Sequence, residues 1–282
     1  MSIAFATFKE ALRKKLFFLV GGLTLIYLAI FALIVHYFML DFERGAMQQG
    51  ISVFTIVSQI VSVLGFYFSS MLVALLTIVS SMTSISAEVE NGTLHSIITK
   101  PIKRYEYVLG KYLGLGILST AYSIILFLVV IIICKVQNLP IISSFDAVTI
   151  AKGLGFFMLH PLVILSLCVF GSSTLRSLTN GIVIISIYVL GLIGSMMEQI
   201  GSVISNDNLY KFGILSSLIS PFDLIYRKMI STIFSDVVIV NPFMGGVGGT
   251  STEPSTWMIV YIFIYLFGLL FLAVKKFGKR DL

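Results

Sequence analysis

Charged side chains are scarce in this chain of 282 residues. Lysine, arginine, aspartate and glutamate make up 11% of it, whereas soluble globular proteins contain about 25%. Hydrophobic residues make up 57%, and the mean hydropathy is +1.03. A soluble domain of this size needs a charged surface that so few residues cannot supply. The composition therefore predicts an integral membrane protein, and it excludes a soluble enzyme, a disordered chain and a nucleic-acid-binding protein.

Cysteines and catalytic motifs are also scarce. Cys134 and Cys168 both lie inside apolar stretches, so neither a disulfide framework nor a zinc site is expected. The sequence contains no HExxH, GxSxG or phosphate-binding GxxxxGK[ST] motif. All 13 carboxylates are expected outside the apolar cores of the spans, whereas an ion-coupled carrier usually needs one at membrane depth. We therefore predict no catalytic, cofactor-binding or metal-binding residue, and the chain is not expected to be an enzyme by itself.

Six stretches are long and apolar enough to span a membrane, which takes about 20 residues. Their approximate limits are 17–39, 51–85, 107–134, 153–173, 181–197 and 256–274. As one helix, the uncharged run 51–85 would reach about 50 Å and exceed the roughly 30 Å hydrocarbon core. The predicted fold is an all-α membrane protein in which residues 17–282 form a six-span domain.

Lysine and arginine flank these spans unevenly. If the N-terminus is cytoplasmic, most of the 19 basic residues lie in cytoplasmic pieces of the chain. The positive-inside rule therefore predicts that both termini are cytoplasmic, which agrees with an even number of spans. Region 198–255 then lies outside. Its apolar pieces are short and interrupted, for example at Ser220-Pro221, so we expect re-entrant or interfacial helices there.

An apolar stripe at three- and four-residue spacing marks the N-terminal segment 1–16. It consists of Phe5, Phe8, Leu12 and Leu16. Because lysines flank the stripe, the segment is predicted to form an amphipathic helix on the cytoplasmic membrane surface. A solvated extension of the first span is the alternative.

The loop 86–106 after the second span contains the most specific pattern. Asn91-Gly92 is suited to end a helix in a left-handed cap, and Thr93 is suited to begin a new one. That new helix would end before Pro101. Its apolar residues Leu94, Ile97 and Ile98 share one face. This face must be buried against the membrane surface, the protein's own helices or a soluble partner.

Polar side chains inside the spans allow two interpretations. His160 precedes Pro161, whose missing N–H frees a backbone carbonyl that the imidazole can satisfy. Ser69 and Ser70 belong to a series of serines in the second span that lets helices approach closely. The alternative is that Ser69, Ser70 and His160 line a translocation path.

The loop residues occur in an ordered set. It consists of Glu88, Gly92-Thr93, Pro101, Arg104 and Gly110-Lys111. This set resembles the motif of type-2 ATP-binding-cassette (ABC) export permeases, and the six spans, the basic N-terminal helix and the external region before the last span are similar as well. The motif covers about 25 residues, and the topology covers the whole chain.

The resemblance implies that this chain is the permease subunit of an ATP-driven exporter in the cell membrane. It would pair with a second permease chain, identical or not, and with two cytoplasmic ATPase subunits, which bind ATP and magnesium. The loop 86–106 would couple the chain to them. The coupling residues would be Glu88, Glu90, Gly92, Thr93, Leu94, Ile97, Ile98, Pro101, Arg104, Gly110 and Lys111. Gly110 and Gly114, four residues apart, would give the third span a small face for close helix packing. A membrane-embedded enzyme or scaffold without an ATPase and an ion-coupled secondary transporter remain as alternatives, and the sequence does not indicate the substrate.

Overall fold

The computed structural model describes residues 2–45, 51–92, 103–139, 146–234 and 256–279. Within these ranges the regular structure is entirely helical. The helices are α1 (Ser2–Arg13), α2 (Lys15–Gly45), α3 (Ile51–Ser81), α4 (Ser86–Glu90), α6 (Arg104–Val136), α8 (Ala147–Thr174), α9 (Ser177–Ile204), α10 (Asp207–Ile219), α11 (Phe222–Ile233) and α12 (Thr256–Gly278).

The predicted six spans are confirmed by length and hydropathy. The helical stretches that qualify are Lys15–Leu40, Val57–Glu90, Arg104–Val136, Ala147–Thr174, Ser177–Ser202 and Trp257–Gly278. Each overlaps one of the six stretches expected from the sequence. The chain is therefore an all-α membrane protein, and its described residues contain six candidate membrane-spanning helices.

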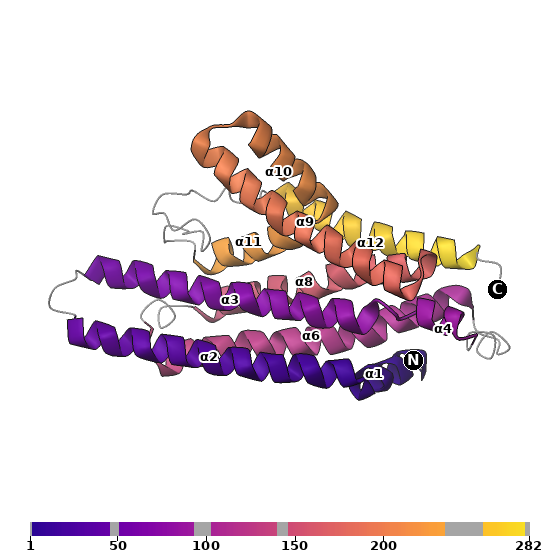
Figure 1. The fold of residues 1–282 in the computed structure, drawn as a ribbon, viewed down its shortest axis with the longest axis horizontal. Coiled ribbons are helices and arrows are strands. Elements are labelled where there is room, and N and C mark those ends of the chain that lie inside the picture. The colour runs from indigo at the N-terminus through magenta and orange to yellow at the C-terminus, as the bar shows by residue number, and fades with distance from the viewer. Residues whose placement is uncertain (1, 46–50, 93–102, 140–145, 235–255, 280–282) are drawn as a thin grey trace.

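Helix α8 lies at the centre of the fold, where it contacts α3, α6, α9, α11 and α12. In Figure 1, α2 and α3 run side by side along one side, and the α9–α10 hairpin rises on the other. Both chain ends and α4 lie at the same end of the molecule (Figure 1). This common placement of the ends agrees with an even number of spans.

The run 51–85, expected as one continuous helix, is interrupted at residues 82–85 before α4 begins. Side chains from distant helices satisfy the backbone groups freed by this break. Ser172 Oγ accepts hydrogen bonds from the amides of Ile85 and Ser86, both at 2.9 Å. The side-chain amide of Asn180 donates to the Met82 carbonyl oxygen at 2.7 Å. Contacts from α8 and α9 therefore stabilise the break. Because these contacts come from residues far away in the chain, no local sequence signal marks the break.

The region 198–255 contains two further helices after the end of α9. Asn206 caps the start of α10, because its side chain accepts hydrogen bonds from the backbone N–H groups of Asn208 and Leu209. Ser220 and Pro221 separate α10 from α11. The region therefore contains short helices, and their re-entrant or interfacial place on the outer face stays a prediction; residues 235–255 lie outside the described ranges.

Candidate functional site

Glu88 links the short helix α4 to α6. Its carboxylate accepts hydrogen bonds from Lys111 Nζ and from the Tyr107 hydroxyl. The Lys111 side chain is 5% exposed, and its ammonium group also lies 3.5 Å from the Glu10 carboxylate of α1. A charge-assisted pair with a buried lysine holds geometry better than a solvated pair, because water competes less for the charges. Three segments of the chain therefore meet at Lys111.

Glu90 links the same short helix to α9. Its carboxylate accepts a hydrogen bond of 2.8 Å from the backbone N–H of Ser177, the first residue of α9. A carboxylate is favoured there because the first turn of a helix has free N–H groups and a partial positive charge. Through its two glutamates, α4 is thus attached to both α6 and α9.

The end of α4 has the conformation expected for Asn91-Gly92. Gly92 has a φ of +67°, in the left-handed region, and its N–H donates to the Val89 carbonyl oxygen at 3.2 Å. The following segment, with the predicted coupling residues Thr93, Leu94, Ile97, Ile98 and Pro101, lies outside the described residues.

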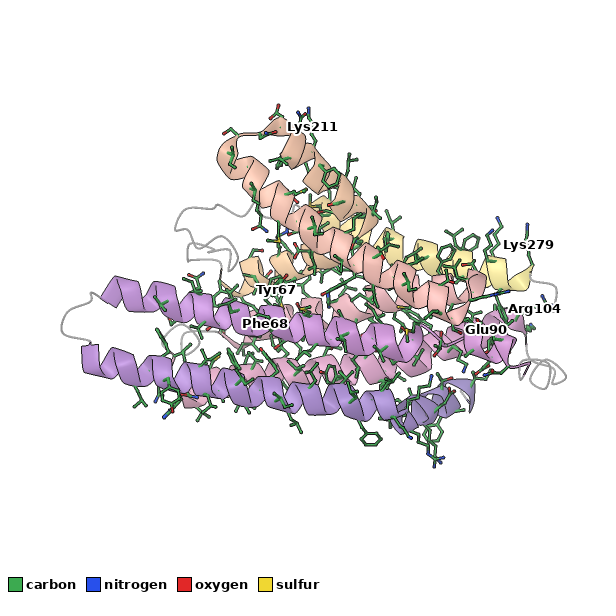
Figure 2. All side chains as sticks on the ribbon, viewed as in Figure 1. Tyr67, Phe68, Glu90, Arg104, Lys211 and Lys279 are labelled. Carbon is green, nitrogen blue, oxygen red and sulfur yellow. The ribbon has the colours of Figure 1, made fainter. Side chains whose placement is uncertain are left out.

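Arg104 lies at the same end of the molecule and contacts α12. Its guanidinium Nη1 donates to the Gly278 carbonyl oxygen at 2.9 Å, at the C-terminus of α12. A cation is favoured there by the free carbonyl groups of the last turn. Figure 2 shows Glu90, Arg104 and Lys279 gathered at this end.

Gly110 and Gly114 provide the small-residue face expected on α6, and the partner at this face is α1. A Cβ atom at position 114 would lie 2.5 Å from the Ala4 carbonyl oxygen, so only glycine permits this approach. The apolar stripe of α1 is divided. Phe8 and Leu12 pack against the buried core, whereas Phe5 is 70% exposed. Helix α1 is therefore docked on the bundle, and its place on the membrane surface stays a prediction.

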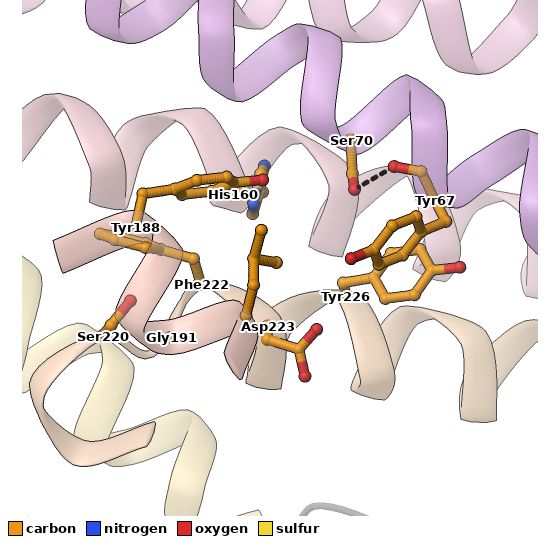
Figure 3. Close-up of a pocket in the computed structure, with 10 residues that line it drawn as sticks. Tyr67, Ser70, His160, Tyr188, Gly191, Ser220, Phe222, Asp223 and Tyr226 are labelled. Carbon is orange, nitrogen blue, oxygen red and sulfur yellow. Dashed lines mark hydrogen bonds between the residues drawn. The ribbon is translucent and has the colours of Figure 1, made fainter. Parts of the chain in front are cut away.

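The structure separates Ser69 from the other two predicted path residues. Ser70 and His160 line one small cavity (Figure 3), whereas Ser69 contacts Tyr27 of α2 through hydroxyl groups 3.1 Å apart. The expected backbone contact of His160 is not formed by its Nδ1 atom, which has no hydrogen bond within the described part of the chain.

One buried cluster was missed by the sequence interpretation, which placed all carboxylates outside the apolar cores. Glu198 of α9 binds the Arg227 guanidinium through two hydrogen bonds of 3.2 and 2.8 Å. Arg227 Nε also lies 3.0 Å from Asp223 Oδ2, which accepts a hydrogen bond from Ser195 as well. The Glu198 and Arg227 side chains are buried, and the Asp223 side chain is 9% exposed. The sequence signal that could have revealed this cluster was the four-residue spacing of Asp223 and Arg227 in an apolar segment.

The two carboxylates of this cluster outnumber its guanidinium. Burial raises the pKa of Asp223 above its ordinary value, while Arg227 and the Ser195 hydroxyl oppose that shift. An excess acid in a buried cluster is costly unless a proton or another cation compensates it.

The six candidate spans of the described residues, with α8 at their centre, define a multi-pass membrane protein. The sequence model of the family described as "ABC-2 family transporter protein" matches residues 1–282. The chain therefore belongs to that family, whose members are transmembrane permease components of ABC transporters, as the loop motif had indicated. A search of curated proteins finds no match.

Proposed function

We propose that this chain is the permease subunit of an ATP-driven exporter in the cell membrane, with both termini in the cytoplasm. It forms the translocation path as a dimer with a second permease chain. Two separate cytoplasmic ATPase subunits bind ATP and magnesium, and this chain binds no cofactor. The observation that carries the proposal is the attachment of α4 to both α6 and α9, directly before segment 93–102.

This attachment gives the coupling a physical route. An ATPase that moves segment 93–102 also moves α4, because the two are continuous in the chain. Glu88 transmits the movement to Lys111 and Tyr107 of α6, and Glu90 transmits it to the start of α9. The break at residues 82–85 separates α4 from α3, so α4 is not a continuous extension of α3. ATP binding would then shift the population between inward- and outward-facing states.

The test separates docking from coupling in the reconstituted complex of this chain with its ATPase. Ile97→Asp combined with Ile98→Asp should abolish co-purification of the ATPase, because charge disrupts an apolar docking face. Glu88→Gln should preserve co-purification but reduce the stimulation of ATP hydrolysis by this chain several-fold, because the charged link to α6 is lost.

Glu106→Gln is the matched control, since Glu106 lies in the first turn of α6 and contacts the exposed Tyr105 hydroxyl. It should leave both association and stimulation unchanged. Undiminished stimulation in the Glu88 variant would overturn the coupling route.

An ion-coupled secondary transporter is the second candidate, because Glu198, Asp223 and Arg227 form a buried charged cluster. Transport by proteoliposomes that contain this chain, an ion gradient and no ATPase would favour it.

A further inference from the structure

A small cavity lies where α3, α8, α9 and α11 meet (Figure 3). It has room for about one water molecule. Polar side chains line it from every one of these helices and from the α10–α11 junction: Tyr67, Ser70, His160, Tyr188, Ser220 and Asp223. A cavity this polar is unlike the dry, apolar voids that remain between packed helices.

Two of these polar groups lack partners although they are buried. His160 is 3% exposed and Ser220 is 1% exposed. Neither His160 Nδ1 nor Ser220 Oγ forms a hydrogen bond with any described residue. Buried polar atoms are nearly always hydrogen-bonded in folded proteins. Two such atoms on the wall of one cavity therefore point to an occupant.

The charge of the neighbouring cluster defines the chemistry of that occupant. With both acids ionised, the described side chains of Glu198, Asp223 and Arg227 together carry one excess negative charge. Both contacts of the Asp223 carboxylate involve Oδ2, and this leaves Oδ1 for an occupant of the cavity that Asp223 lines. A water molecule would satisfy the hydroxyl and the imidazole but would leave the charge to be compensated by a proton on Asp223, whereas a bound cation satisfies these groups and compensates the charge together.

The aromatic walls favour a cation as well. The rings of Tyr67 and Tyr226 meet edge to face with centroids 5.4 Å apart, and those of Tyr188 and Phe222 stack at 5.8 Å. All four residues line the cavity. Aromatic faces attract cations through their quadrupoles, most strongly where water is excluded.

We propose that this cavity binds a monovalent cation or a primary ammonium group, with Asp223 Oδ1, Ser220 Oγ and His160 Nδ1 as its polar contacts. A monovalent cation and an ammonium group are each about the size of a water molecule, and each places one positive charge beside the excess carboxylate. The site is independent of any ATPase, because all of its residues belong to this chain.

The test measures thermal unfolding of the purified full-length chain in lipid nanodiscs. Cys134 and Cys168 are both completely buried, so a thiol-reactive fluorogenic dye reports unfolding. Sodium, potassium, ammonium or methylammonium chloride is titrated against N-methylglucamine chloride at constant pH and ionic strength. We expect a saturable rise of the Tm of about 2 °C or more, because a ligand that binds only the folded state stabilises it.

The choice of salts distinguishes an inorganic ion from an organic amine as the ligand of the cavity. A rise with sodium or potassium identifies an inorganic ion, whereas a rise with ammonium and methylammonium alone identifies the amine end of an organic molecule. An equal Tm in all salts means that the cavity holds only water, and it overturns the proposal.

Two variants connect the effect to the cavity. Asp223→Asn removes the excess charge, so it should abolish the salt-dependent rise. Ser220→Ala keeps the charges and should raise the half-saturating salt concentration roughly threefold to tenfold through the loss of one polar contact. It remains informative even if the Asp223 variant does not fold.

Ser231→Ala is the matched control. Ser231 is a buried serine of α11 that donates to the Lys228 carbonyl oxygen of its own helix at 3.0 Å and does not line the cavity. It should leave the titration unchanged. If Ser220→Ala and Ser231→Ala shift the titration equally, the proposed site is wrong.

Discussion

At the scale of single residues, Arg227 is important because its guanidinium contacts two acidic side chains. Arg227→Met would remove the guanidinium that both Glu198 and Asp223 contact. We expect this change to lower the free energy of unfolding by about 3–5 kcal/mol, the usual cost of breaking a buried ion pair. Thermal unfolding in nanodiscs measures the loss.

Restoring the charge balance should reverse most of that loss. Combining Arg227→Met with Glu198→Gln and Asp223→Asn removes all three charges, and the Tm should recover toward the wild-type value. A triple variant as unstable as Arg227→Met would mean that packing of the arginine side chain, and not its charge, maintains this cluster.

The sequence was sufficient to predict the conformation and packing of residues whose role is local. The left-handed conformation of Gly92 followed from its place after a helix, and the small face of Gly110 and Gly114 followed from their spacing. The sequence was insufficient to predict the pairing of Glu198 with Arg227, because the turn at Ser205 and the whole of α10 separate them in the chain. Their pairing depends on how the α9–α10 hairpin folds back, which local patterns do not specify.

At the scale of whole helices, the contact between α1 and α6 is the clearest prediction. Gly114→Val should force α1 away from α6, because even a Cβ atom there would lie 2.5 Å from the Ala4 carbonyl oxygen and 2.9 Å from Thr7 Cβ. The salt bridge between Lys111 and Glu10 should be lost with it. Faster proteolysis of residues 1–14 would report the detachment.

Gly155→Val in α8 is the matched control, since a Cβ atom at position 155 meets no atom within 4 Å. It should leave the rate of proteolysis unchanged. Equal rates in the Gly114 variant and the wild type would show that α1 tolerates a side chain at this contact.

Hydropathy predicted the six long helices because each span must be apolar along its length. It did not predict the break at residues 82–85. That break contains neither glycine nor proline, and Ser172 and Asn180 stabilise it from helices that follow about 90 residues later. Long-range hydrogen bonds of this kind are invisible to a sliding window along the chain.

At the scale of the whole molecule, the orientation in the membrane can be tested with single cysteines. Cys134 and Cys168 are completely buried, so they should not react with a membrane-impermeant maleimide in the folded protein. Lys9, Lys211 and Lys279 are exposed, and Figure 2 shows Lys211 on α10, away from Lys279 at the end of the chain. The variants Lys9→Cys, Lys211→Cys and Lys279→Cys therefore sample both ends and the external region.

The excess of lysine and arginine near the termini predicts that these termini are cytoplasmic, because translocating basic residues across the membrane is unfavourable. Lys211→Cys should therefore be labelled in intact cells, whereas Lys9→Cys and Lys279→Cys should be labelled only after permeabilisation. Because α1 and the end of α12 lie at the same end of the bundle as α4, the two terminal variants must behave alike. Labelling of one terminus but not the other in intact cells would require an odd number of spans and would contradict both the fold and the proposed contact with a cytoplasmic ATPase.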